Sequence, residues 1–193
     1  MAKGNIVANL ISSSKTLLRP SDNLTKLSGF GSPSKIEATI VENCRGIEFI
    51  LHVVLAWATA QPKIRAVALV GSHARGTARP DSDIDLMLLT TDPHGLRADT
   101  TWVVQIDWHA VGTRPQKWQD EEYGAAWSRR VWLADCRWPV ELTFASLIWA
   151  NADPLDAGTQ RVISDGCRIL HDPDALLAVV CKAVGRERAC RSS

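Results

Sequence analysis

The stretch from residue 66 to residue 89 constrains the fold of this chain more than any other. Its first part, residues 66–70, is a short apolar run that ends at a glycine, which is typical of a buried strand. Its last part, residues 84–89, is a second apolar run with Asp83 and Asp85 at its start. The pattern predicts strand, glycine turn and strand, an arrangement that gathers phosphate-binding groups and metal ligands in a small volume.

The turn between the two strands has the residue types that bind anions. Gly71 allows the backbone to approach a ligand closely and to adopt angles that other residues avoid. Ser72 offers a hydroxyl and a backbone N–H. If a short helix follows, its free N–H groups favour a negative charge above the turn. The turn therefore predicts a phosphate-binding element.

Asp83 and Asp85 stand two residues apart, and residues i and i+2 of a strand share a face. Ile84 and Leu86 are then expected to face the core, while both carboxylates face one pocket. Two carboxylates held this close repel unless a cation lies between them or one takes a proton. A hard divalent ion such as Mg²⁺, shared with substrate phosphates, suits the pair.

Gly71-Ser72, ten further residues and then Asp83-Ile84-Asp85 resemble the signature of the DNA polymerase β-like nucleotidyltransferase superfamily, and within it the small, minimal nucleotidyltransferases. The resemblance covers residues 36–180. It implies an α+β fold, the nucleotidyltransferase fold, with a small mixed β-sheet and helices packed mainly on one face. It also implies a third carboxylate on a neighbouring strand, for which Glu141, between apolar residues, is the candidate.

The resemblance implies an enzyme that moves a nucleoside monophosphate, expected to be AMP from ATP, to a hydroxyl with release of pyrophosphate. Two Mg²⁺ ions, for which Mn²⁺ can substitute, would act on the entering and leaving oxygens. The implied metal-binding and catalytic residues are Asp83, Asp85 and Glu141. The implied nucleotide-binding residues are Gly71, Ser72, Arg75 and Ser82.

Simpler interpretations of some of these residues stay open. Glu141 could be a solvent-facing strand residue if the strand register slipped by one. Arg75 could be a surface arginine, and Ser82 could serve only as a turn hydroxyl. For the chain as a whole, the alternative to an enzyme is a catalytically silent nucleotide-binding or partner-binding module, such as an antitoxin-like protein.

The expected partners are a nucleoside triphosphate and an acceptor, either a small molecule or a protein. The net charge of +1 gives no general attraction to nucleic acid or to an anionic membrane. No apolar run approaches the length of a membrane span, and no second domain of the kind that grips nucleic acid is evident. The five cysteines lack metal-ligand spacing and are odd in number, which favours free thiols and a cytoplasmic location.

Three regions are expected along the chain. Residues 1–33, rich in serine and basic residues, are interpreted as a flexible extension, although an organelle transit peptide has a similar composition. Residues 34–184 form the nucleotidyltransferase domain, and residues 185–193 form a basic tail.

Apolar periodicity predicts a helix over residues 34–60. A turn at residues 91–95, a short helix near residues 98–105 and a polar loop to residue 122 are expected next. A hairpin of strands at residues 126–133 and 140–144 would bring Glu141 into the sheet. A helix, a glycine and a strand follow in residues 153–172, and Asp172 is expected to cap a helix over residues 175–184. The tryptophans of the second half are expected to pack in the core or in loops.

Overall fold

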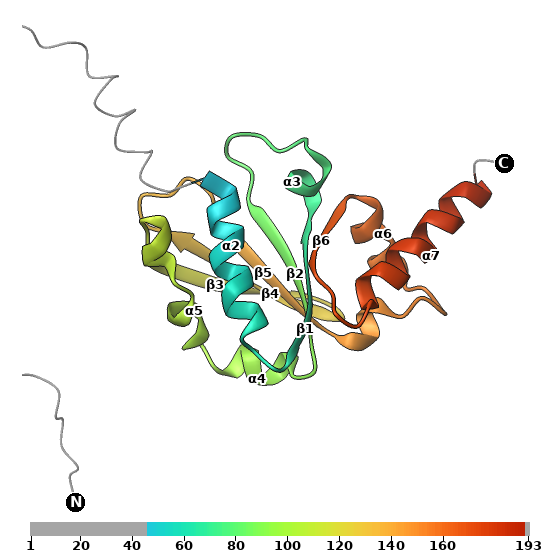
Figure 1. Ribbon diagram of the computed structural model, residues 1–193, viewed down its shortest axis with the longest axis horizontal. Helices are drawn as coiled ribbons and strands as arrows, with labels where there is room; N and C mark the ends of the chain where they lie inside the picture. The colour runs from blue at the N-terminus through green and yellow to red at the C-terminus, as the bar shows by residue number, and fades with distance from the viewer. Residues whose placement is uncertain (1–45, 192–193) are drawn as a thin grey trace, which may run out of the picture. The chain divides into compact units, whose positions relative to one another are not determined.

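The computed structural model describes residues 46–191, with side chains to residue 185, and shows a six-stranded mixed sheet in the order β3-β4-β5-β2-β1-β6 (Figure 1). The strands are β1 Ile64–Val70, β2 Ile84–Thr90, β3 Pro115–Tyr123, β4 Ala126–Leu133, β5 Val140–Ser146 and β6 Cys167–His171. The helices are α2 Gly46–Thr59, α3 Gly71–Arg75, α4 Pro93–Ala98, α5 Trp102–Gln105, α6 Ala157–Ser164 and α7 Leu176–Arg191, with 3₁₀ turns η1 Trp108–Val111 and η2 Leu147–Ala150.

The predicted α+β fold with a mixed sheet is confirmed. Neighbouring strands are antiparallel except for β2 and β5, which run parallel at the centre of the sheet. A parallel pair needs a long crossover, and here the crossover contains three short helical segments and the β3–β4 hairpin. This central pair sets Asp85 directly beside Glu141.

Helices cover both faces of the sheet, whereas one main helical face was expected. On one face, α2, α5 and η1 pack on a core that includes Val54, Trp102 and Leu88. On the other face, η2, α6 and α7 pack on a smaller core that includes Ala68, Met87 and Leu177. The reason lies in β1 and β2, whose residues are buried on both sides, since such strands need cover on both faces.

Helix α2 confirms the second half of the helix predicted over residues 34–60. Its buried residues Ile50, Val54 and Ala58 recur every fourth position, which puts them on one face against the sheet. Residues 34–45 of the predicted helix lie outside the described residues, as does the predicted extension at residues 1–33.

Two elements of the crossover differ from expectation. The predicted turn at residues 91–95 is the start of α4, because Asp92 accepts the Gly95 N–H at 2.9 Å and Pro93 occupies the first turn. The predicted polar loop contains β3, a nine-residue strand at the edge of the sheet. Most of its residues are exposed, so it lacks the apolar alternation by which a strand is recognised.

The C-terminal part follows the predicted order of helix, glycine and strand in α6, Gly166 and β6. The last helix begins at Leu176, one residue after the predicted start, and extends to Arg191. Ala175 has a φ of 57°, a left-handed conformation that cannot continue into a helix, and the Asp172 carboxylate instead accepts the Ala178 N–H at 2.9 Å. Within the described residues, none of these helices is both long and apolar enough to cross a membrane.

Candidate active site

The turn after β1 is built around a close approach between Gly71 and Asp85. Gly71 has a φ of 70°, which is unfavourable for residues with a side chain. A Cβ atom at this position would lie 2.7 Å from Oδ2 of Asp85. Helix α3 starts here and ends at Arg75, and the residue that follows, Gly76, is also left-handed. Glycine at position 71 therefore leaves room for a carboxylate of the site itself.

Three carboxylates converge at this edge of the central strands. Asp83 lies directly before β2, Asp85 lies in β2 and Glu141 lies in β5. One oxygen atom of each lies within 4.8 Å of the others. Ile84 and Leu86 point to the opposite face and are buried there, as expected from their alternation with the acids. The structure thus brings together all three of the predicted metal ligands.

The cluster is electrostatically strained without a cation. Burial raises the pKa of Asp85 to about 7, and the charges of Glu141 and Asp83 add to the shift. Burial also raises the pKa of Asp83, although Arg130 acts in the opposite direction. A hard divalent cation prefers oxygen ligands and would relieve this repulsion. The three residues therefore fit a divalent metal site, and their role as its ligands stays a prediction.

Arg130 in β4 is the cation that this structure places at the cluster. Its Nη2 atom lies 3.0 Å from Oδ2 of Asp83 and 2.7 Å from Oε2 of Glu141. The hydrogen bond to Glu141 is the largest cause of the raised pKa of Arg130. Arg130 was not among the predicted site residues. The signal was available, because a hairpin centred on residues 135–137 pairs Arg130 with Glu141.

The predicted phosphate-binding residues lie on one side of the cluster, around a polar hollow. Ser72 lines this hollow together with Arg75, Ser82 and Asp83. Arg75 is held by other contacts, since its guanidinium donates to the Asp165 carbonyl and its Nε lies 3.4 Å from Oγ1 of Thr77. The Ser82 hydroxyl accepts the Arg79 N–H at 2.9 Å, so it does act as a turn hydroxyl. We call this the phosphate-side hollow.

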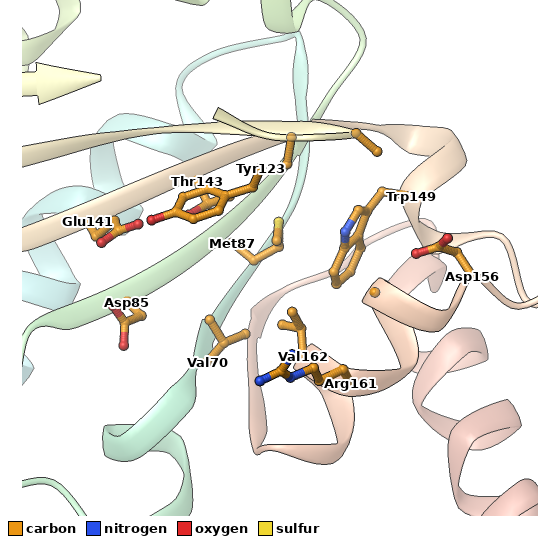
Figure 2. A pocket seen from close by; sticks show the side chains of 13 residues that line it. Val70, Asp85, Met87, Tyr123, Glu141, Thr143, Trp149, Asp156, Arg161 and Val162 are labelled. Atoms are coloured by element: carbon orange, nitrogen blue, oxygen red, sulfur yellow. The ribbon is translucent and has the colours of Figure 1, made fainter. Parts of the chain in front are cut away.

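A second cavity, of about 540 Å³, lies on the other side of the cluster, between the sheet and the segment from η2 to α6 (Figure 2). Asp85 and Glu141 lie at one end and Trp149 at the other, with Met87 between them. We call this the α6 cavity. Its lining residues are Val70, Asp85, Met87, Tyr123, Ala125, Ala126, Glu141, Thr143, Trp149, Asp156, Gly158, Arg161 and Val162.

Several residues of the α6 cavity were not among the predicted site residues. Tyr123 belongs to the strand that was expected to be a loop, and its hydroxyl donates to Oε2 of Glu121 at 2.7 Å. This bond is the largest cause of the raised pKa of Tyr123, to which Glu141 also contributes. Trp149 is held in place because the Thr159 hydroxyl donates to its carbonyl at 2.8 Å. No local motif singles out these residues, since tertiary packing brings them together.

The carboxylates separate two spaces of different character. Asp83 lines the phosphate-side hollow, while Asp85 and Glu141 line the α6 cavity. The hollow is lined mainly by hydroxyl and charged groups, and the cavity has apolar walls. Such an arrangement can hold a polyanion on one side, a second reactant on the other and cations between them.

Residues 54–133 match the family model described as the nucleotidyltransferase domain. The match confirms the resemblance stated from the Gly71-Ser72 turn and the aspartate pair, and with it the enzyme class of a nucleotidyltransferase. The matched segment includes Arg130 and ends before Glu141. Among curated proteins, no match was found.

Three solved structures resemble the chain at low identity. One, described as a toxin-antitoxin with AMP-PNP, is 12% identical with a TM-score of 0.37, over 73% of this chain and 89% of that chain. Two mutants of the toxin-antitoxin MntA-HpeT are 13% and 12% identical, each with a TM-score of 0.35 and covering 72% of this chain. They cover 86% and 87% of those chains. The assignment therefore depends on the domain match and on the site itself.

Proposed function

We propose that this chain, which carries a nucleotidyltransferase domain, transfers a nucleoside monophosphate from a nucleoside triphosphate to a hydroxyl group and releases pyrophosphate. ATP is the proposed donor, and the acceptor is a small molecule or a protein. The observation that carries the proposal is the convergence of Asp83, Asp85 and Glu141 between a polar hollow and a second cavity.

The carboxylates account for the metal requirement of such a reaction. Asp83 and Asp85 would hold a cation on the side of the phosphate-side hollow, and Glu141 would complete a second site with them. Two Mg²⁺ ions, or Mn²⁺ in their place, would supply the positive charge that the entering and leaving oxygens need. Asp85, whose pKa is raised to about 7, would give up its proton when the cation binds.

The chain's own groups account for the placement of the nucleotide. Ser72, at the first turn after β1, would bind the terminal phosphates through its hydroxyl and its backbone N–H. Ser82 closes the opposite side of the hollow. Arg75 would add positive charge nearby while remaining anchored to the Asp165 carbonyl. Gly71 would act indirectly, by leaving room for Asp85.

Glu141 is the proposed acceptor of the proton from the attacking hydroxyl, because it faces the α6 cavity on the side away from the hollow. Arg130 holds the Glu141 carboxylate through hydrogen bonds from Nε at 3.2 Å and Nη2 at 2.7 Å. The bonds orient the carboxylate, which is what a general base requires.

Calorimetry with ATP, GTP, CTP and UTP in Mg²⁺ or Mn²⁺, followed by transfer of labelled nucleotide in a lysate of the source cell, tests the proposal. The double variant Asp83→Asn with Asp85→Asn is expected to lose label transfer while keeping the fold. Asp135→Asn, in an exposed turn, is the matched control and is expected to behave as wild type. If the wild type and the double variant are alike in every assay, partner binding included, the silent binding module becomes the better interpretation.

A further inference from the structure

The α6 cavity lies where the attacking group of the proposed reaction must enter. In an in-line displacement, the attacking and leaving oxygens are on opposite sides of the phosphorus atom. If the leaving pyrophosphate lies in the phosphate-side hollow, the acceptor approaches from the side of Asp85 and Glu141, which line the α6 cavity. This inference rests on the proposed function and concerns the chemistry of the acceptor.

Beyond the carboxylate end, apolar side chains form most of the walls of the α6 cavity, and a few polar groups, among them Arg161, lie between them. Val70 and Met87 from the sheet face Val162 of α6 across the cavity, and the Trp149 indole forms the far end (Figure 2). An indole presents a large flat surface on which a planar group can stack. A sugar-like polyol would leave the hydroxyl groups that face Val70, Met87 and Val162 without partners, and unpaired polar groups are costly to bury. The walls therefore favour a compact acceptor with a planar, apolar body.

The charges around the α6 cavity favour an anion over a cation. Asp85 and Glu141 are committed to the cluster, and Asp156 accepts the Thr159 N–H at 3.0 Å as the N-cap of α6. Arg161 projects from α6 toward Val70 and forms no ion pair in the described part of the chain. A polycationic acceptor would meet this guanidinium, and the cavity's carboxylate outside the cluster, Asp156, is already engaged by the Thr159 N–H.

We propose that the α6 cavity binds the acceptor, and that the acceptor is an alcohol with a planar apolar body and a negatively charged group. The body lies against Trp149 and Met87, the anion pairs with Arg161 and the hydroxyl points to Glu141. The hydroxyl oxygen forms the new bond to the α-phosphorus, the bond from that phosphorus to the bridging oxygen breaks, and pyrophosphate leaves. The hydroxyl proton passes to Glu141 and then to water.

Three matched probes test the proposal on the full chain: 4-(hydroxymethyl)benzoate, 4-(hydroxymethyl)benzamide and 4-(hydroxymethyl)benzylamine. They share a ring and a primary alcohol, and they differ in charge. Label transfer from α-labelled ATP, together with probe binding by ligand-observed NMR, should favour the benzoate over the benzylamine by about two- to fivefold, as expected for an exposed ion pair. Arg161→Gln should bring the two rates to the same value.

Trp149→Leu should lower kcat/KM for all three probes by about three- to tenfold, because the stacking surface is lost. Arg168→Gln is the control, since Arg168 is an exposed arginine on β6 that pairs with Glu48. It should leave the order of the probes unchanged. Arg161→Gln changes only an exposed side chain, so it keeps the test valid if Trp149→Leu fails to fold.

Three results would overturn the acceptor assignment. The first is a wild type that prefers the benzylamine or does not distinguish the probes. The second is a charge preference that survives in Arg161→Gln. The third is an effect of both cavity variants on ATP affinity and not on the probes, which would place the nucleoside in the α6 cavity. Wild-type affinity for ATP is measured separately: if ATP does not bind, the proposed function fails as well.

Discussion

At the scale of single residues, the site depends on the electrostatic repulsion between three neighbouring carboxylates. Burial raises the pKa of Asp85 from 3.8 to about 7, and the charges of Glu141 and Asp83 add to the shift. Among the described residues, Arg130 forms ion pairs with Asp83 and Glu141 but none with Asp85. Asp85 is therefore the acid of the cluster that takes a proton when no metal is present.

Asp85→Asn is expected to stabilise the metal-free protein at pH 8 by roughly 1–3 kcal/mol, because it removes a buried charge that the fold disfavours. The folded pKa lies above the unfolded value of 3.8, so the native state binds the extra proton. The stability that Asp85 contributes is complete below about pH 4 and is lost as the pH rises to about 7. Denaturant unfolding in EDTA from pH 4 to pH 8 measures this, and a wild type whose stability relative to Asp85→Asn is constant with pH would contradict it.

Gly71→Ala should destabilise the protein by about 2–4 kcal/mol, because the new methyl group meets Asp85 at a φ of 70°. Gly124→Ala is the matched control: Gly124 has a φ of 66° with nothing within 4 Å of the added Cβ. It should cost only the backbone strain, about 1 kcal/mol. Equal losses of stability in urea unfolding would show that the contact with Asp85 has no energetic effect.

At the scale of elements, an ion pair helps to hold β3 to the sheet. The polar sequence of this edge strand does not by itself indicate the pair. Arg129 in β4 is 2% exposed, lies 2.7 Å from Asp120 of β3 and stacks between Trp102 and Trp127 at 5.2 and 5.3 Å from the ring centroids. Tyr123, at the end of β3, reaches the α6 cavity. The pair thus anchors the strand that carries Tyr123 to the core at Trp102 and Trp127.

Asp120→Ala should cost about 3 kcal/mol, because it leaves a buried guanidinium without its partner. Glu122 lies on the same strand, and Glu122→Ala, which breaks its exposed pair with Arg97 of α4, should cost less than about 0.5 kcal/mol. Hydrogen exchange of the β3 amides should accelerate in the first variant only. Similar exchange in both variants would mean that β3 is held by its backbone ladder alone.

At the scale of the whole molecule, the metal ligands come from segments far apart in the sequence. Asp83 and Asp85 lie just before and within the second strand and Glu141 lies in the fifth, and the parallel β2–β5 pair sets Asp85 beside Glu141. An unfolded chain does not keep this cluster. A cation that binds the native cluster must therefore stabilise the entire fold.

Mg²⁺ at 100 times its dissociation constant should stabilise the wild type by about 2.7 kcal/mol and raise its Tm. Glu141→Gln should reduce this gain by lowering the affinity, and Asp83→Asn with Asp85→Asn should abolish it. Differential scanning calorimetry at pH 8 measures the shift, with Asp135→Asn as the control. A metal-dependent rise in Tm that persists in the double variant would place the cation elsewhere.

Much of the site could be predicted because its signals are local. The Gly71-Ser72 turn, the alternation of Asp83 and Asp85 with Ile84 and Leu86, and the hairpin that carries Glu141 each depend on neighbours a few residues away. Strand alternation and turn chemistry operate over such distances. The family match over residues 54–133 bears out the resemblance that these signals carried.

Other features were decided only by tertiary structure. The polar strand β3 exists because β4 offers it a ladder, and helices cover both sheet faces because β1 and β2 are buried on both sides. Arg130 reaches Asp83, and Trp149 and Arg161 reach the cavity, through packing between distant segments. The sequence by itself determined the chemistry of the turn and the acids, since local backbone geometry sets these. The tertiary structure decided what surrounds them, because long-range packing has no local signature.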